Sequence, residues 1–133
     1  IKQVNIFDVD NAFVKGDHRT LERAFNNIIS NAFEAMKQTS EDKVLTVKLC
    51  TSSSEIIHKP VIQIDFSDTG PGIPEEIRDK IFEPYFTASK GGTGLGLPIT
   101  KQIITAHQGN IKVISIPGAT VVRIQLPQYN EGI

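Results

Sequence analysis

The sequence predicts an α+β fold, a two-layer sandwich in which a mixed, mostly antiparallel sheet carries about three helices packed on one face. Several short segments alternate apolar and polar residues, as half-buried strands do, and longer segments repeat apolar residues at helical spacing. The strand-like segments come in pairs joined by short turns, which favours hairpins. The 133 residues suffice for one ordinary core, so residues 1–133 are expected to form a single domain.

The first part of the chain combines short strands with one clear helix. Residues 4–9 alternate apolar and polar side chains, and residues 12–17 resemble a second short strand that ends in a turn. Residues 20–36 place apolar side chains at i, i+3, i+4 and i+7, which predicts an amphipathic helix. Asp17 or Thr20 can cap this helix, because short polar side chains accept hydrogen bonds from the first free N–H groups.

A hairpin and a short helix are expected next. Residues 43–51 and 61–66 both alternate, so residues 43–67 are predicted to fold back on themselves. After a glycine-rich turn, Pro74 suits the first position of a helix that is expected to reach about Ile81.

The last part of the chain is expected to hold one more helix and a second hairpin. Residues 95–107 return to helical spacing, and Gly109 is expected to end that helix. Residues 111–116 and 121–126 alternate on either side of a Pro-Gly turn, as the two strands of a hairpin do.

Composition and charge exclude several classes of function. Lys and Arg number 14 against 15 Asp and Glu, so there is no basic field to attract nucleic acid. No apolar run approaches the roughly 20 residues that cross a bilayer, and we expect no direct membrane contact by this domain. The single cysteine, Cys50, excludes an internal disulfide and is expected to be a small apolar strand residue.

A polar stripe on the first long helix has two possible explanations. Arg23, Asn27, Asn31 and Glu34 follow one another at helical spacing, away from the apolar face. Such a stripe is ordinarily a solvated face. Asparagine is a poor helix former, however, and its amide oxygen is a neutral ligand for Mg²⁺ that helps bridge the ion to phosphates. Both explanations remain open on the residues alone.

Two glycine-rich turns suggest that a nucleotide is held between them. Asp68 leads the turn Asp-Thr-Gly-Pro-Gly-Ile, where its carboxylate can accept a hydrogen bond from a purine amino group or simply cap the turn. Gly92, Gly94 and Gly96 precede a helix whose N-terminus favours phosphate oxygens. No Lys-Ser/Thr follows these glycines, and no βαβ strand leads into them, so they are neither a Walker loop nor a Rossmann turn.

Four blocks in order resemble the ATP-binding catalytic domain of two-component sensor histidine kinases, in the GHKL superfamily with the Bergerat ATP-binding fold. Leu-Glu-Arg-Ala-Phe-Asn-Asn-Ile-Ile-Ser-Asn-Ala-Phe-Glu-Ala-Met is similar to the N box, and Asp-Thr-Gly-Pro-Gly-Ile to the G1 box. Ile-Phe-Glu-Pro-Tyr-Phe-Thr resembles the F box, and Gly-Thr-Gly-Leu-Gly-Leu the G2 box. The resemblance covers residues 4–127, nearly the whole chain.

The resemblance implies ATP and Mg²⁺ as cofactors and assigns roles to the matching positions. Asn31 would bind Mg²⁺ and, through it, the ATP phosphates, and Asn27 would lie beside it; these two are the expected catalytic residues. Asp68 would bind the adenine amino group, with Thr120 near the adenine. Residues 87–92 would form a short ATP lid, followed by a helix that meets the phosphates. The further positions that would shape the pocket or contact phosphate are Gly70, Gly72, Ile73, Lys90, Gly92, Thr93, Gly94, Leu95, Gly96 and Leu97.

One departure from the superfamily bears on the reaction. Its hydrolases place a glutamate four residues before the metal-binding asparagine, as the base that activates water, and this chain has Asn27 there. An amide cannot act as a general base. The resemblance therefore implies transfer of the γ-phosphoryl group rather than efficient hydrolysis. A GHKL-type ATPase module, a non-catalytic ATP-binding regulatory domain and a serine-directed kinase are the alternatives.

The same resemblance implies which partners the domain serves. His18, His58 and His107 do not lie in the His-Glu/Asp-x-x-x-Pro setting of a phosphoacceptor, so the dimerisation segment that bears this histidine is expected to lie outside the chain. The acceptor would be a histidine on the separate dimerisation helix of the same kinase, with a response regulator downstream. A cytoplasmic location is implied, whether or not the parent is membrane-anchored. The parent would resemble a homodimer, whereas the fragment alone is compatible with a monomer.

Overall fold

The computed structural model describes residues 1–9, 12–37, 42–83, 96–116 and 118–129. One five-stranded sheet has the strand order β1-β2-β3-β5-β4. The first strand pairs parallel with the second, and the remaining neighbours pair antiparallel. The expected mixed, mostly antiparallel sheet is therefore confirmed. Its strands are β1 (Lys2–Phe7), β2 (Val44–Ser53), β3 (Pro60–Asp68), β4 (Asn110–Ile116) and β5 (Ala119–Pro127).

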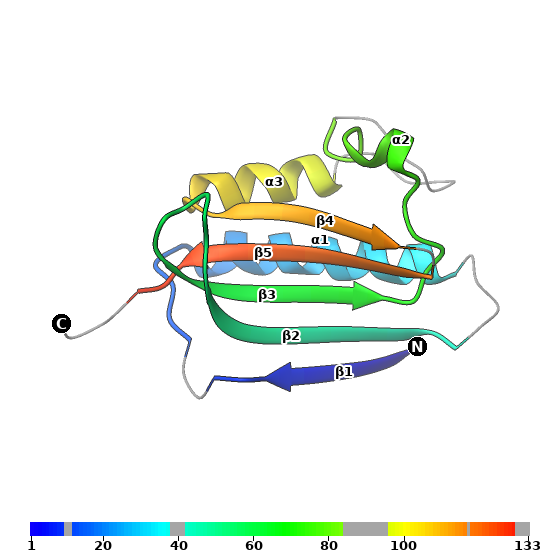
Figure 1. Ribbon diagram of the computed structural model, residues 1–133, viewed down its shortest axis with the longest axis horizontal. Helices are drawn as coiled ribbons and strands as arrows, with labels where there is room; N and C mark the ends of the chain where they lie inside the picture. The colour runs from blue at the N-terminus through cyan, green and yellow to red at the C-terminus, as the bar shows by residue number, and fades with distance from the viewer. Residues whose placement is uncertain (10–11, 38–41, 84–95, 117, 130–133) are drawn as a thin grey trace.

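In the described part of the chain, three helices accompany the sheet (Figure 1). They are α1 (His18–Met36), α2 (Glu75–Arg78) and α3 (Gly96–Ala106). Of the two capping candidates, Asp17 is the N-cap of α1, since its carboxylate accepts a hydrogen bond of 3.0 Å from the Arg19 N–H. Among the described residues, none of the helices combines the length and hydropathy needed to cross a membrane.

The core lies between the two long helices and one face of the sheet. Strand side chains alternate between the two faces of a sheet, so every second residue of β3 and β5 points toward the helices. The rings of Phe25 and Phe66 meet there, with their centroids 6.0 Å apart. Because both long helices contribute to one cluster, they cover the same face, as expected. Its buried members are Leu21, Ala24, Ile28, Phe66, Ile104, Ile124 and Leu126.

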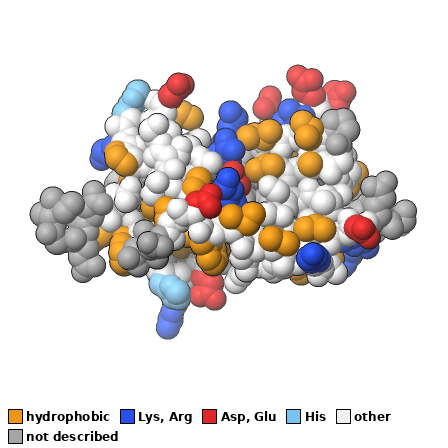
Figure 2. All heavy atoms as spheres, turned by 60° about the horizontal axis from the view of Figure 1, so that its bottom comes forward, with side chains coloured by type: hydrophobic (Ala, Val, Ile, Leu, Met, Phe, Trp, Pro, Cys, Tyr) orange, Lys and Arg blue, Asp and Glu red, His pale blue; other side chains and the backbone are white. Residues whose placement is uncertain are grey.

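The opposite face of the sheet carries no helix of the described chain and is polar along its middle. The Arg123 guanidinium donates to both carboxylate oxygens of Asp65, at 2.9 and 3.1 Å, and this contact raises the pKa of Arg123. Gln125 donates to Gln63 beside this pair, at 3.0 Å. In the view of Figure 2, acidic and basic side chains meet near the middle of the surface, with hydrophobic side chains around them. This face is therefore polar along its middle and mixed in character around it.

Two expected elements differ from the structure. The strand over residues 12–17 is wrong: this segment connects β1 to α1, and Phe13 accepts one backbone hydrogen bond, from Tyr129 at 2.8 Å, with no sheet neighbour. The short helix ends at Arg78 rather than near Ile81. Beyond it the backbone bonds join residues three apart, which makes successive turns instead of an α-helix.

The C-terminus of α3 ends on a residue other than glycine. Gln108 has φ = 63°, in the left-handed region that favours glycine. The Gly109 N–H reaches back to the Ile104 carbonyl at 2.9 Å, which completes the helix end. A Cβ on Gly109 would lie 2.6 Å from the Gln125 carbonyl oxygen, so Gly109 is needed for close packing against β5. The expectation that Gly109 ends the helix thus holds, but the unusual backbone conformation belongs to its neighbour.

Replacing Gln108 with glycine is expected to raise the free energy of unfolding by about 1 kcal/mol, because the left-handed conformation costs about that much for a residue with a Cβ. Chemical denaturation measures the change. The matched control is Gln102→Gly at an exposed position inside α3, which should lower the free energy of unfolding by about 1 kcal/mol. A loss of stability in Gln108→Gly would contradict the prediction.

His107 joins the end of α3 to the start of α1. Its Nδ1 lies 2.8 Å from the Ile103 carbonyl oxygen, and its Nε2 accepts a hydrogen bond of 3.0 Å from the Asp17 N–H. Because Nε2 accepts from Asp17, Nδ1 is the ring nitrogen that can donate to the Ile103 carbonyl. Gly16 lies directly against this ring, where a Cβ would collide with it. His107 thus has a structural role, since it ties the C-terminal end of α3 to the start of α1.

Candidate functional site

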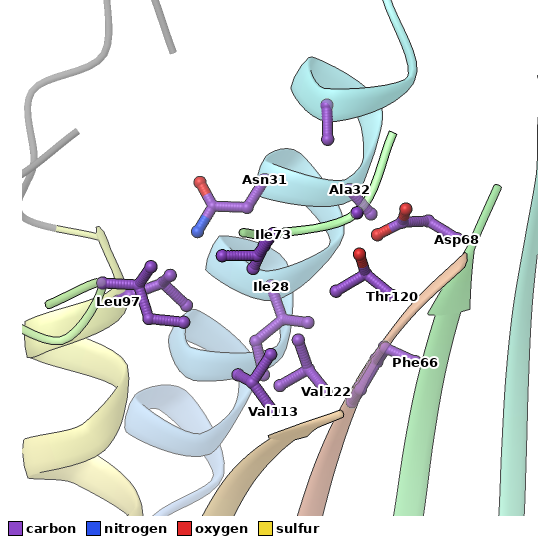
Figure 3. A pocket seen from close by; sticks show the side chains of 13 residues that line it. Ile28, Asn31, Ala32, Phe66, Asp68, Ile73, Leu97, Val113, Thr120 and Val122 are labelled. Carbon is purple, nitrogen blue, oxygen red and sulfur yellow. The ribbon is translucent and has the colours of Figure 1, made fainter. Parts of the chain in front are cut away.

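A pocket of about 80 Å³ opens between α1, the start of α3 and the ends of β3, β4 and β5 (Figure 3). Three of its lining residues are polar: Asn31, Asp68 and Thr120. Gly72 contributes backbone. The remaining lining residues are apolar and form its walls: Ile28, Ala32, Ala35, Phe66, Ile73, Ile81, Leu97, Val113 and Val122. Pockets with apolar walls and a few directed polar groups are typical of sites for small organic ligands.

At one end of the pocket a buried carboxylate stands beside a buried hydroxyl. Asp68 and Thr120 are directly opposite each other on β3 and β5, and each is 6% exposed. The Gly70 N–H donates to Asp68 Oδ1 at 2.9 Å. Burial raises the pKa of Asp68, and this backbone hydrogen bond partly offsets the rise. A carboxylate can accept several hydrogen bonds, so Asp68 can still accept from a donor on a ligand.

The glycines after Asp68 bring backbone close to the pocket. A Cβ on Gly70 would lie 2.9 Å from Asp68 Oδ1 and 3.3 Å from the Ala35 Cβ. Gly72 has φ = 84°, and a Cβ there would lie 2.9 Å from the Ile116 carbonyl oxygen. Both positions therefore need glycine for the turn itself, whatever they contact in a ligand.

The other end of the pocket brings α1 and α3 together. Asn31 is exposed on α1, and a Cβ on Gly96 would lie 3.8 Å from its Nδ2 and 3.9 Å from its Oδ1. Asn27 is half-buried one turn earlier, and its Nδ2 donates to the Gly96 carbonyl at 3.4 Å. The first turn of α3 therefore lies beside Asn31, and free N–H groups at a helix start attract anions.

The structure brings most of the expected site residues together. Asn31, Asp68, Gly72, Ile73, Leu97 and Thr120 line the pocket. Gly70 adjoins it through Asp68, and Asn27 and Gly96 adjoin it through the contact of α1 with α3. The expected lid over residues 87–92 lies outside the described residues, as do the individual positions Lys90, Gly92, Thr93, Gly94 and Leu95.

Apart from Ile73 and Leu97, the apolar wall residues were not predicted as part of the site. Ile28 and Ala32 follow the same apolar stripe of α1 that forms the core, so their periodicity indicated only burial. Val113 and Val122 likewise alternate like any half-buried strand residue. The one available signal was proximity in sequence, because Ile28 and Ala32 flank Asn31 along the helix.

A metal ion at this site would depend on few protein ligands. Over the described ranges no group of three or more His, Cys, Asp or Glu side chains is arranged to hold a metal ion. The Asn31 amide oxygen at the pocket mouth is a neutral oxygen donor, which suits Mg²⁺ when phosphates supply further oxygens. The residues present therefore fit an ion that arrives with a phosphate ligand.

The comparisons with known proteins identify the family. A family model described as "Histidine kinase-, DNA gyrase B-, and HSP90-like ATPase" matches residues 16–130. The chain belongs to this family. The chain is 38% identical over 115 residues to the sensory histidine kinase/phosphatase NtrB of Vibrio alginolyticus, with 84% of this chain and 33% of the relative covered. It thus spans about a third of that relative's length.

Solved structures of histidine kinases share the fold of this ATPase-family domain. The nucleotide-free catalytic domain of histidine kinase ThkA superimposes with a TM-score of 0.80 at 27% identity, covering 96% of this chain and 78% of that one. The mycobacterial sensor histidine kinase MprB gives a TM-score of 0.77 at 29% identity, covering 95% and 82%. The resemblance to histidine kinase catalytic domains is therefore confirmed. ATP as the nucleotide is confirmed at the level of the ATPase family.

Proposed function

We propose that this domain binds Mg²⁺-ATP, with the adenine at the Asp68–Thr120 end of the pocket and the phosphates at the Asn31–Gly96 end. The observation that carries the proposal is the difference between the two ends of the same pocket. A buried carboxylate and hydroxyl stand at one end, and a helix start with an exposed amide stands at the other, with apolar walls between them. Figure 3 supports this division, since Asp68 and Thr120 lie together on the right in that view, while Asn31 projects from α1 apart from them, above Ile73.

The adenine end favours adenine over guanine. The carboxylate of Asp68 accepts hydrogen bonds and would pair with the 6-amino group of adenine. Guanine presents an oxygen at that position, which would leave two acceptors facing each other in a buried site. The apolar side chains of Phe66 and Val122 supply the surface that a flat, weakly polar ring needs.

At the phosphate end the domain's own groups supply position and charge. The start of α3 would offer N–H groups to phosphate oxygens, and Asn31 would hold the Mg²⁺, which when bound neutralises phosphate charge. Asn27 would keep the start of α3 in place through its hydrogen bond to Gly96. The contacts that the sequence assigns to Lys90, Gly92, Thr93, Gly94 and Leu95 stay predictions.

We further propose that the γ-phosphoryl group is passed to a histidine and not to water. Asn27 has no basic oxygen or nitrogen to take a proton from water. The acceptor would be a histidine on the dimerisation helix of the parent kinase, whose nitrogen forms the new N–P bond while the bond to ADP breaks. A response regulator would then receive the group. Catalysis would consist mainly of positioning and electrostatic stabilisation.

The test uses ATP labelled on the γ-phosphate, with Mg²⁺, and the domain alone or with the histidine-bearing dimerisation segment of the parent. We expect acid-labile label on the added segment and little free phosphate. The control is the same segment with its histidine replaced by glutamine, which should stay unlabelled. Steady release of free phosphate by the domain alone would refute the transfer proposal and make this an ATPase module. Nucleotide binding without either product would make it a regulatory ATP-binding domain.

A further inference from the structure

Both backbone polar groups of Ile73, a wall residue of the pocket, are held by two side chains outside the pocket lining. The Ile73 N–H donates to Ser115 Oγ at 2.7 Å. The Ile73 carbonyl accepts from Arg78 Nη2 at 3.2 Å, and the same nitrogen donates to the Ser115 carbonyl at 3.3 Å. The turn after β3, the helix α2 and the end of β4 are thus tied together at one point.

Gly72 also allows the turn after β3 to lie close against β4. A Cβ on Gly72 would lie 2.9 Å from the Ile116 carbonyl oxygen and 3.0 Å from Ser115 Oγ. Because glycine has no Cβ, the turn can approach β4 closely enough for Ser115 and Arg78 to bind the backbone of Ile73. Ser115 supplies the hydroxyl and Arg78 the guanidinium group for these hydrogen bonds.

Ser115 also reaches the polar end of the pocket. Its Oγ lies 3.5 Å from Thr120 Oγ1, and the two residues are opposite each other on β4 and β5. Since Ser115 Oγ already accepts from Ile73, its own proton can be directed to Thr120 Oγ1. The Thr120 proton is then available to the pocket beside Asp68. Ser115 therefore links the apolar wall to the polar end.

Arg78 is poorly arranged for stability alone. Its Nε is buried and has no hydrogen-bond partner among the described residues. A buried donor without a partner costs free energy that a smaller or apolar residue would avoid. Arg78 Nη2 donates to the carbonyls of both Ile73 and Ser115. These two hydrogen bonds hold the turn after β3 at a fixed distance from β4.

We propose that Ser115 and Arg78 are positioning residues for the adenine end of the pocket, an inference that rests on the proposed function. Neither residue is among those that line the pocket. Ser115 fixes the position of Ile73 through the Ile73 N–H and orients the Thr120 hydroxyl. Arg78, on α2, fixes the position of Ile73 through its carbonyl. Because Ile81 of the segment after α2 also lines the pocket, Arg78 further connects the position of that segment to the adenine end.

The test measures the affinity of the domain for ATP, ADP and adenosine by calorimetry, well below the melting temperature. Ser115→Ala and Arg78→Met are each expected to raise all three dissociation constants by the same factor, about fivefold, as for one lost hydrogen bond. In the phosphotransfer assay KM for ATP should rise while kcat stays. The double variant should show less than the product of the two effects, because both residues act on Ile73. Ser115→Thr, which keeps the hydroxyl, should restore affinity.

Exposed positions provide the controls, with Arg19→Met on α1 and Ser52→Ala on β2 expected to change none of the three constants. Failure of the unmodified domain to bind any of the ligands would refute the proposed function itself. Normal binding by the unmodified domain, together with Ser115→Ala and Arg78→Met variants that lose only thermal stability, would overturn the positioning role alone. Weakened ATP binding with unchanged adenosine binding would also overturn it, since the effect would then lie at the phosphates.

Discussion

Replacing Asn31 with alanine is expected to weaken the binding of Mg²⁺-ATP by at least about tenfold, because the variant loses an oxygen ligand of the ion. Asn31 is exposed at the mouth of the pocket, so its truncation should leave folding intact. Titration calorimetry with and without Mg²⁺ measures the effect. Without Mg²⁺ the affinities of the variant and the unmodified domain for ATP should converge, since the proposed role of Asn31 acts through the ion.

The matched control for this prediction is Asn26→Ala, an exposed asparagine on the same helix that faces away from the pocket lining. It should bind Mg²⁺-ATP like the unmodified domain. If Asn31→Ala binds Mg²⁺-ATP with unchanged affinity, the metal assignment is wrong, and the asparagines of α1 then form a solvated stripe.

Replacing Asp68 with asparagine is expected to weaken ATP binding by about 10- to 100-fold, which corresponds to the loss of a hydrogen bond to a charged acceptor. The amide keeps an oxygen that can accept from Gly70, so the turn after β3 should persist. It also presents an N–H₂ group, which is the wrong partner for the adenine amino group. The unmodified domain should strongly prefer ATP to GTP. Equal affinity for the two nucleotides would refute adenine recognition by Asp68.

The same variant has an expected pH signature in stability. Burial raises the pKa of Asp68 above its ordinary value of 3.8, so the native state binds this proton more tightly than the unfolded chain. The carboxyl therefore lowers the free energy of unfolding as pH rises from 3.8 to the raised pKa, and the loss persists above it. Asparagine does not titrate. The stability of Asp68→Asn relative to the unmodified domain should thus increase through this interval and then level off.

Denaturation at a series of pH values checks this signature, with the exposed Asp79→Asn as the control for loss of one carboxylate. A variant that binds ATP poorly yet is at least as stable at neutral pH would identify Asp68 as a functional residue whose burial costs stability. A stability difference that does not change with pH would contradict the burial argument.

Local patterns in the sequence were sufficient to predict most of the helices and strands. The helical spacing in α1 and the alternation in β2 through β5 depend only on which face of each element meets the core. The strand expected over residues 12–17 failed because alternation does not reveal whether a partner strand exists. The expected end of α2 near Ile81 failed because a proline and an acidic first turn start a helix but do not set its length.

The polar residues of the site could be predicted from the sequence because their residue types are unusual for the helix or turn in which they lie. Asn27 and Asn31 are poor helix formers within a helix, and Asp68 begins a turn with two glycines. The residues around them gave no such signal. Ser115 and Arg78 resemble ordinary surface residues of a strand and a short helix until the turn after β3 is placed against β4.

By itself the sequence determined the fold class and, through the four blocks that carry the resemblance, the family. It also singled out Asn31, Asp68 and Thr120, the polar residues that line the pocket, because residue type and periodicity are local properties. Only the tertiary structure decided that Asp68 stands opposite Thr120, that Gly96 lies beside Asn31, and that core residues of α1 continue as pocket walls. These arrangements depend on strand register and on the packing of α1 against α3. Both are set by contacts between residues far apart in the chain, which no local pattern records.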